Sequence, residues 1–308
     1  MKNKIVAALA AAALTMGLLT GCGSSSADTA ADSAAAEETT EAAEETTGED
    51  AKESSEAADG DNVITVAATL TPHSEILEAV KDVLAEQGYE LEVTVFEDYV
   101  QPNNVVDSGE MDANYFQHVN YLNSFNEENG TNLVVAENGK IHYEPFGIYG
   151  GTKSDLADIA DGDAIAIPND TTNEARALLL LQQEGLITLA EDAGVTATVN
   201  DVTENPYNLE LVEVEAAQVA KQLGSVAFGV INGNYALENG LSVGEDALAI
   251  ESADGDAIQQ YVNVIAVKEG NESSAKIKAL TDALHSATAV DYINDTYEGA
   301  VVPYDGEQ

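Results

Sequence analysis

Basic residues are scarce in this sequence of 308 residues, which has eleven Lys and Arg against 56 Asp and Glu and a net charge of −45 at pH 7. A nucleic-acid partner is therefore not expected, because neutralising phosphates requires a basic surface. Cysteine occurs once, at Cys22, so the chain cannot form a disulfide within itself. Arginine also occurs once, at Arg176, in a chain that otherwise uses lysine.

Sequence signatures of catalysis are missing too. The chain has no G-x-S-x-G, no G-x-x-x-x-G-K-[ST], no G-x-G-x-x-G after a strand and no cysteine nucleophile. Its histidines are scattered, with no His-x-x-x-His pair, so a metal site is weakly supported. They are His73, His118, His142 and His285. We therefore predict a protein that is not an enzyme and that needs no cofactor or metal.

The N-terminal segment carries an export signal. Lys2 and Lys4 precede a small-apolar run at residues 5–18 that is too short to span a bilayer, which is typical of a secretory signal over residues 1–22. The signal ends in Leu-Thr-Gly-Cys, which resembles the bacterial lipobox, where a peptidase cuts before the cysteine and lipid is attached to it. We expect lipidation at Cys22 and a protein anchored to the cell membrane that faces outside the cytoplasm.

Residues 23–61 consist almost wholly of Ser, Ala, Thr, Gly, Glu and Asp. Without aromatic or large aliphatic side chains they cannot bury enough apolar surface to offset chain entropy, so we predict a disordered acidic tether. The remaining residues, 62–308, are enough for two lobes of ordinary size or for one large α/β domain.

Residues 62–308 alternate between strand and helix patterns. The apolar run 62–70 predicts a buried strand, residues 74–88 show a helical stripe of apolar side chains, and residues 89–96 alternate like a second strand. Strand, helix and strand in this order form a βαβ unit, which implies a parallel sheet covered by helices. The patterns recur, with strands at 163–170, 209–215, 225–232 and 260–270 and helices at 171–185 and 274–287. The predicted fold class is α/β.

Ligand sites in such sheets lie where strands end and loops lead into helices. Four stretches fall at such ends: TLTPHSEI (69–76), DANYFQHVNYL (112–122), PNDTTNEAR (168–176) and VINGNYA (230–236). Each combines polar side chains with aromatics or glycines, so these are the candidate binding loops.

The third stretch places the single arginine near the start of a predicted helix. Thr171 followed by Glu174 matches a capping box, which makes Thr171 the predicted N-cap of a helix. Arg176 then shares a face with Asn173 near the positive end of the helix dipole, a suitable place for an anion. A guanidinium offers a carboxylate two parallel hydrogen bonds, whereas an ammonium is a point charge. The alternative is an ordinary surface salt bridge with one of the many acidic residues.

The second stretch places Phe116, His118 and Tyr121 close together. They could wall an apolar pocket with polar tips. Aromatic residues at such spacing also occur as plain core, and a single histidine as a satisfied hydrogen-bonding side chain. The residues alone leave both interpretations open.

Together these stretches resemble the methionine-binding lipoproteins of bacterial ABC importers, the NlpA lipoprotein family. The resemblance rests on the lipobox and on PHSEIL, DYVQPN, MDANYFQHVNYL, PNDTTNEARALLLLQQEGLI, ENPYNLELVEVEAAQ and VINGNYA, in this order. It implies a two-lobed periplasmic-binding-protein-like fold (type II), each lobe a mostly parallel sheet flanked by helices, with the ligand cleft between the lobes. The expected lobes are residues 62–145 with 262–308, and residues 146–261.

The resemblance also implies ligand contacts. The arginine that holds the ligand carboxylate falls on Arg176 and its neighbouring amide on Asn173, while Asn232 is expected to contact the amino or carboxylate group. The walls around the ligand thioether suit sulfur, which packs well against rings. They fall on Tyr99, Phe116, His118 and Tyr121.

The implied function is capture of L-methionine outside the cytoplasm and its delivery, after lobe closure, to the permease of an ABC importer. We expect a monomer. Val119, Asn120 and Glu144 depart from the family pattern, although none of them is a family contact. The alternatives are a carrier of another small amino acid or short peptide, a surface adhesin without a transport role, and a zinc enzyme that uses His118.

Overall fold

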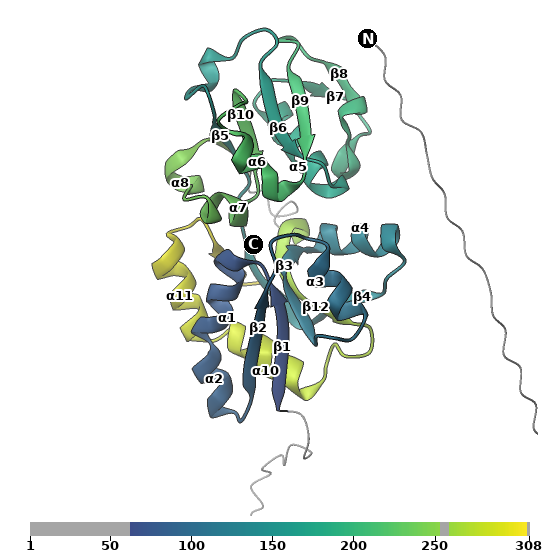
Figure 1. The fold of residues 1–308 in the computed structure, drawn as a ribbon, viewed down its shortest axis with the longest axis vertical. Coiled ribbons are helices and arrows are strands. Elements are labelled where there is room, and N and C mark those ends of the chain that lie inside the picture. Colours follow the sequence, from purple (N-terminus) through teal and green to yellow (C-terminus); the bar gives the residue numbers. More distant parts are fainter. Residues whose placement is uncertain (1–61, 253–258, 307–308) are drawn as a thin grey trace, which may run out of the picture. The chain divides into compact units, whose positions relative to one another are not determined.

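The computed structural model describes residues 62–252 and 259–306 (Figure 1). The predicted signal segment, the lipidation site Cys22 and the tether at 23–61 lie outside the described residues. Two larger sheets and the helices between their strands make up most of the described chain.

Sheet A has six strands in the order β13-β4-β12-β3-β1-β2. They are β1 (Val63–Ala68), β2 (Glu90–Val95), β3 (Ala113–His118), β4 (Leu133–Tyr143), β12 (Val262–Lys268) and β13 (Val302–Pro303). β1 pairs in parallel with β2 and β3, whereas β12 pairs antiparallel with β3 and β4, and β13 antiparallel with β4. The parallel β1–β2 pair confirms the βαβ unit predicted at the start of the folded region.

Sheet B has five strands in the order β11-β5-β10-β6-β9. They are β5 (Gly147–Gly150), β6 (Ala164–Pro168), β9 (Glu210–Val214), β10 (Phe228–Ile231) and β11 (Ala247–Ile250). β6 pairs in parallel with β9 and β10, whereas β5 pairs antiparallel with β10 and β11. A separate antiparallel pair is formed by β7 (Thr188–Leu189) and β8 (Val202–Glu204).

The predicted two-lobed α/β architecture is confirmed, but the expectation that each sheet is mostly parallel is wrong. The strands next to the two connections between the sheets, β4 to β5 and β11 to β12, all pair antiparallel with their neighbours. A βαβ crossover imposes parallel pairing only on strands that it joins within one sheet. A strand that arrives from the other sheet is free of that constraint. No periodicity in the sequence indicates whether such a strand pairs parallel or antiparallel.

Helices follow most strands. Those between strands of sheet A are α1 (Glu75–Ala79), α2 (Lys81–Glu86), α3 (Gln101–Asp107), α4 (Val119–Asn129), α10 (Ala275–Leu284) and α11 (Ala287–Tyr297). Those between strands of sheet B are α5 (Thr171–Gln183), α6 (Ala216–Gln222), α7 (Gly233–Glu238) and α8 (Val243–Asp246). Short turns of helix are η1 (Leu70–Ser74), η2 (Leu156–Asp158), η3 (Gly194–Thr196) and η4 (Val199–Asp201).

The helix predicted at 74–88 is two helices in the structure. Val80 separates α1 from α2 with φ −101° and ψ 3°, outside helical geometry. The apolar stripe that indicated the helix is nevertheless fully buried: Ile76, Leu77, Val80 and Leu84. Periodicity identified the buried face correctly, because that face depends on side-chain spacing and tolerates one irregular turn.

Each sheet has its own apolar core. Ile64, Tyr115 and Ile265 of sheet A belong to one cluster with side chains of the neighbouring helices, which include Leu77, Leu280 and Ile293. Ile165, Ile167 and Phe228 of sheet B belong to another cluster with Leu178 and Leu181 of α5. Each fully buried side chain of this size contributes roughly 1.5–3 kcal/mol. These cores hold the strand ends from which the candidate site is built.

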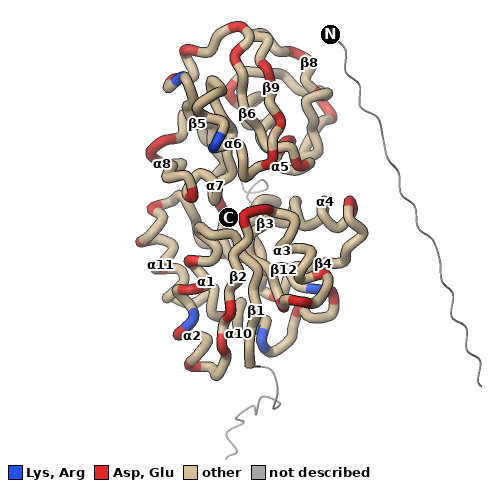
Figure 2. The backbone as a smooth tube through the Cα atoms, viewed as in Figure 1, with Lys and Arg blue, Asp and Glu red and all other residues tan. Residues whose placement is uncertain are grey.

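Acidic residues are spread along the described chain, with few basic residues among them (Figure 2). This distribution agrees with the acidic composition of the whole sequence. Within residues 62–252 and 259–306, no helix has the length and apolar character needed to cross a bilayer.

Candidate functional site

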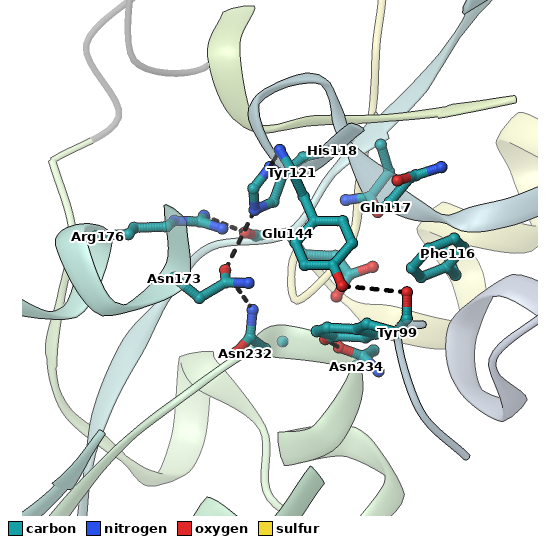
Figure 3. A pocket seen from close by; sticks show the side chains of 12 residues that line it. Tyr99, Phe116, Gln117, His118, Tyr121, Glu144, Asn173, Arg176, Asn232 and Asn234 are labelled. Atoms are coloured by element: carbon teal, nitrogen blue, oxygen red, sulfur yellow. Dashed lines mark hydrogen bonds between the residues drawn. The ribbon is translucent and has the colours of Figure 1, made fainter. Parts of the chain in front are cut away.

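One pocket contains all seven residues that the sequence analysis assigned to a ligand site. They are Tyr99, Phe116, His118, Tyr121, Asn173, Arg176 and Asn232. Figure 3 shows Arg176, Asn173 and Asn232 toward the left of the pocket and the rings of Tyr99 and Phe116 toward the right. The pocket therefore has a polar end and an aromatic end.

Five further residues line the pocket that the sequence analysis did not assign to it: Gln117, Glu144, Gly233, Asn234 and Asn263. Gln117, Gly233 and Asn234 are chain neighbours of assigned residues, and that adjacency was the available signal. Glu144, which the resemblance placed outside the contacts, lines the wall. A Cβ at Gly233 would come within 2.8 Å of the Glu144 side chain, so only glycine leaves this carboxylate in place.

Strand ends deliver most of these side chains. Phe116, Gln117 and His118 are the last residues of β3, Asn232 directly follows β10, and α5 begins shortly after β6. Three of the four candidate binding loops lie at the carboxyl ends of β1, β6 and β10, as predicted, whereas the stretch at 112–122 contains the whole of β3 and the start of α4. Parallel strands bring such ends to one edge of a sheet, which explains how distant segments share the pocket.

The N-terminus of α5 differs from the sequence prediction. Asp170, and not Thr171, is the N-cap, and its Oδ1 accepts from the backbone N–H of Asn173 at 3.0 Å. Asp170 Oδ1 also accepts from Asn173 Nδ2 at 2.9 Å. The side chain of Glu174 accepts instead from the backbone N–H of Val199, so the expected capping box does not form. One carboxylate thus caps the helix and orients the Asn173 amide.

Arg176 is buried, with 4% of its surface exposed. Its Nε donates to Glu251 Oε2 at 2.8 Å, and its Nη2 donates both to Glu251 Oε1 and, at 2.9 Å, to the carbonyl oxygen of Glu144. The rings of Tyr261 and Phe146 lie 4.2 and 4.8 Å from Arg176 Cζ. The guanidinium does form an ion pair, but in the interior, so the surface salt bridge of the alternative interpretation is wrong.

The ion pair keeps the guanidinium charged. Burial alone would lower the pKa of Arg176, but the Glu251 carboxylate outweighs burial and the pKa is raised. Nη1 makes no hydrogen bond to any part of the chain that the structure describes. Arg176 lines the pocket, and Nη1 is the nitrogen of its guanidinium that is left without a partner among the described residues.

His118, Asn173 and Asn232 form a chain of hydrogen bonds along the pocket wall. The backbone N–H of Tyr121 donates to His118 Nδ1 at 3.1 Å, which leaves the ring proton on Nε2, and Nε2 donates to Asn173 Oδ1 at 3.2 Å. Asn232 Nδ2 donates to the same oxygen at 2.8 Å. Burial, with Arg176 nearby, lowers the pKa of His118 to about 3, so the ring is neutral near pH 7.

One polar atom of the Asn232 side chain forms no hydrogen bond within the described residues. This atom is the buried Oδ1. Leaving a buried acceptor unpaired costs about 1–3 kcal/mol. An N–H donor on a bound molecule would recover that free energy.

The aromatic end of the pocket is formed by Tyr99, Phe116 and Tyr121. The centroid of the Tyr99 ring lies 5.6 Å from the centroids of both Phe116 and Tyr121. Phe125 packs behind Tyr121 at 6.2 Å. Phe116 and Tyr121 are also buried, so the two interpretations of this stretch, core and pocket wall, both hold.

Tyr99 also joins segments that belong to different sheets. Its hydroxyl donates to Asn234 Oδ1 at 2.5 Å, and its ring stacks on Tyr235 with centroids 4.9 Å apart. Tyr235 in turn donates from its hydroxyl to the carbonyl oxygen of Glu97 at 3.2 Å. These bonds connect the loop between β2 and α3 to helix α7, beside the aromatic end of the pocket.

Glu144 belongs to a buried cluster with two histidines. Its Oε1 lies 2.7 Å from His142 Nε2 and 3.3 Å from His73 Nε2. The other ring nitrogens bond to hydroxyls, His73 Nδ1 to Thr69 at 2.8 Å and His142 Nδ1 to Tyr115. Burial lowers the pKa of His73 to about 4 and that of His142 to about 3, and it raises the pKa of Glu144.

His73, His142 and Glu144 are the described group whose donor atoms come close enough, within 4.8 Å, to hold a metal ion. The fold brings together two histidines that looked scattered in the sequence. Each ring nitrogen already has a hydrogen-bond partner in the protein: Nε2 of His142 bonds to Glu144 and Nε2 of His73 to Asn263 Oδ1, while both Nδ1 atoms bond to hydroxyls. This is a complete arrangement without a metal. The absence of a metal site stays a prediction.

The pocket and fold can be compared with known proteins. The model of the NlpA lipoprotein family matches residues 64–304. This chain belongs to the NlpA lipoprotein family. A curated relative, the methionine-binding lipoprotein MetQ of Bacillus subtilis (strain 168), is 43% identical over 252 residues, which cover 80% of this chain and 90% of that protein.

Solved structures of the NlpA type extend the comparison. A lipoprotein from Ruminococcus gnavus ATCC 29149 is 64% identical, with a TM-score of 0.77, 79% of this chain covered and 100% of that one. A nutrient-binding protein from Burkholderia cenocepacia, solved with bound methionine, is 39% identical, with a TM-score of 0.73, 78% of this chain covered and 99% of that one.

Proposed function

We propose that this protein is the extracytoplasmic substrate-binding lipoprotein of an ABC importer and that it captures methionine. The observation that carries the proposal is the pocket, in which one buried arginine and an unpaired amide oxygen lie at one end and a group of rings at the other. An amino acid with an apolar side chain has the matching order of groups. The bound methionine of the Burkholderia cenocepacia protein supports the same ligand class.

In the proposed complex, the ligand carboxylate accepts from Arg176 Nη1. The sequence analysis expected both arms of the guanidinium to hold the ligand, but Glu251 occupies the edge formed by Nε and Nη2. The amide oxygen of Asn173 accepts hydrogen bonds from His118 and Asn232, so the proposed role of Asn173 is to orient these two side chains.

The ligand ammonium is proposed to donate to Asn232 Oδ1 and to face the Glu144 carboxylate. Asn232 Oδ1 is a buried acceptor that lacks a described partner, and Glu144 supplies negative charge on the same wall. A positively charged group in the pocket would also offset the cost of burying Glu144.

The thioether is proposed to lie against Tyr99, Phe116 and Tyr121, with His118 at the border between the two ends. Sulfur gains roughly 0.3–1.5 kcal/mol from contact with an aromatic ring. A side chain without sulfur but of similar length keeps most of the apolar contact, so discrimination among apolar amino acids is expected to be moderate.

The remaining parts of the proposal concern the rest of the chain. Lipid on Cys22 is proposed to anchor the protein to the membrane, where a monomer with lobes 62–145 plus 262–308 and 146–261 delivers its ligand to the permease. The division of strands between sheets A and B supports these lobe limits. No step of this cycle breaks a covalent bond in the ligand, so we propose a carrier without catalytic activity.

Isothermal titration of the full chain tests the ligand. The protein, purified in detergent and freed of bound ligand by unfolding and refolding, is titrated with L-methionine, D-methionine, other apolar amino acids and short peptides. Heat with methionine at micromolar or lower Kd is the expected result. Heat only with another amino acid or a peptide would identify that molecule as the ligand in place of methionine. No heat with any of these compounds would reject the proposed carrier function.

A further inference from the structure

Glu251 accepts two hydrogen bonds from Arg176, although it does not line the pocket. It follows strand β11 directly, where the chain leaves sheet B. We infer that Glu251 is a positioning residue, which aims Nη1 of Arg176 at the ligand carboxylate and ties that donor to both chain segments connecting the sheets. The inference rests on the proposed function.

The first step concerns the orientation of the guanidinium. Glu251 accepts hydrogen bonds from two of the three nitrogens of the Arg176 guanidinium, Nε and Nη2. It therefore holds one whole edge of the planar group. The carbonyl oxygen of Glu144 accepts from Nη2 as well, and the ring of Tyr261 lies 4.2 Å from Cζ. With one edge and one face fixed, the plane cannot turn, and Nη1 remains as the group directed to the ligand.

The second step concerns what holds Glu251 itself. Its Oε1 accepts from the hydroxyl of Tyr143 and from the backbone N–H of Phe146 at 3.0 Å. The backbone N–H of Glu251 donates to the carbonyl oxygen of Phe146, also at 3.0 Å. Tyr143 ends β4 and Phe146 immediately precedes β5, so these bonds join the outgoing connection to the returning one.

The third step concerns charge. Arg176 and Glu251 are both largely buried, with side-chain exposures of 5% and 11%, and together they carry no net charge. A ligand carboxylate therefore does not meet an isolated cation. Its affinity depends on a well-placed Nη1 donor more than on net charge, and placing that donor is the role that we assign to Glu251.

The test compares a ligand that has a carboxylate with one that lacks it. Glu251→Gln keeps the size of the side chain but replaces one acceptor with a donor that opposes Arg176. We expect the Kd of the full chain for L-methionine to rise at least tenfold, while the Kd for L-methioninol, in which a hydroxymethyl group replaces the carboxylate, changes less than threefold. Both are measured by ligand-induced thermal shift, which reaches millimolar Kd values.

The matched control is Glu174→Gln. Glu174 is also buried on α5 and accepts one backbone hydrogen bond, but it lies outside the pocket. It is expected to leave the ratio of the two Kd values unchanged.

Equal losses for both ligands in Glu251→Gln would overturn the inference, because they indicate a general structural role. Unchanged or tighter methionine binding would also overturn it, because Glu251 would then only mask the charge of the arginine. Failure of the parent protein to bind methionine is a different result, and it would reject the proposed function.

Discussion

At the scale of single residues, the one arginine of the chain lies at the polar end of the candidate site. Arg176 contacts a carboxylate, a carbonyl oxygen and two aromatic rings while it lines the pocket. A lysine ammonium has three donors on a flexible stem and no planar edge to match a carboxylate. The surroundings thus explain why a chain with ten lysines has an arginine at this position.

Arg176→Lys is expected to weaken methionine binding by about 2 kcal/mol, roughly thirtyfold in Kd. The ammonium cannot hold both oxygens of Glu251 and also reach the ligand, so at least one partner loses its donor. Isothermal titration of parent and variant measures the change. Binding that is unaltered by the substitution would remove the arginine from the ligand site.

The buried histidines predict how stability depends on pH. The folded pKa values of His73 and His142, about 4 and 3, lie below the ordinary value of 6.5. Such groups contribute stability that is present above pH 6.5 and is lost as the pH falls toward the folded pKa, because the unfolded chain binds the extra protons. The slope approaches about 1.4 kcal/mol per pH unit for each histidine.

His142→Gln is expected to reduce the steepness of this loss between pH 6.5 and 4.5 by the contribution of one proton. Urea unfolding of the parent protein and the variant at several pH values measures the slope. Glu144 acts in the opposite sense, since its raised pKa costs stability as the pH rises through the folded value. A flat profile for the parent protein would contradict the prediction.

At the scale of secondary-structure elements, helix α5 depends on a cap that the sequence pattern misplaced by one residue. Asp170→Ala removes an N-cap, which costs roughly 1 kcal/mol of stability, and it also frees the Asn173 amide. We expect a lower melting temperature together with weaker methionine binding.

Thr171→Ala is the matched variant, because Thr171 lies in the first turn of the same helix and its hydroxyl bonds an exposed glutamate, Glu128. Its effect on stability is expected to stay within about 0.5 kcal/mol. Thermal unfolding and titration of both variants separate the two residues. A larger loss in Thr171→Ala than in Asp170→Ala would restore Thr171 as the cap.

The sequence patterns predicted the positions of helices and strands better than they predicted how the strands pair. Residues 163–170 and 171–185 correspond to β6 and α5, and the buried stripe of 74–88 was found although Val80 splits the helix. The patterns did not predict β3, β4, β5, β11 and β13 of the two larger sheets, although they did predict β12, which also lies beside a connection, at 260–270. Local patterns report burial and turn chemistry, whereas pairing direction depends on the path of the chain.

The candidate site shows the same limit. Loops at strand ends pointed to the seven assigned residues, which do share one pocket. Glu144 and Glu251 were not assigned, because the sequence contains 56 acidic residues and nothing local separates a buried carboxylate from a solvated one. Glu251 is 75 positions from Arg176 in the sequence, and only the folded chain brings the two residues together.

At the scale of the whole molecule, ligand binding is expected to stabilise the folded state. Methionine at 100 times its Kd contributes about 2.7 kcal/mol by linkage, which corresponds to a rise in Tm of roughly 5–10 °C for a folded region of this size. Differential scanning fluorimetry with and without methionine measures it. An adhesin without a ligand cleft would show no shift.

The proposed lipid anchor at Cys22 lies outside the described part of the chain. Cys22→Ser is expected to move the protein from the membrane fraction to the soluble exported fraction, since the lipid attachment site is gone. Fractionation of cells followed by immunoblotting measures the change, with Ser24→Ala as the control. A variant that stays in the membrane fraction would reject the anchor.

The buried pair of Arg176 and Glu251 has a consequence for the kinetics of capture. Because the pair is neutral and methionine near pH 7 is a zwitterion without net charge, the strongly acidic surface neither attracts nor repels the incoming ligand over long distances. The association rate is then set by diffusion and pocket access and stays nearly constant as ionic strength changes. The carrier would collect its ligand equally fast from dilute and from salty surroundings.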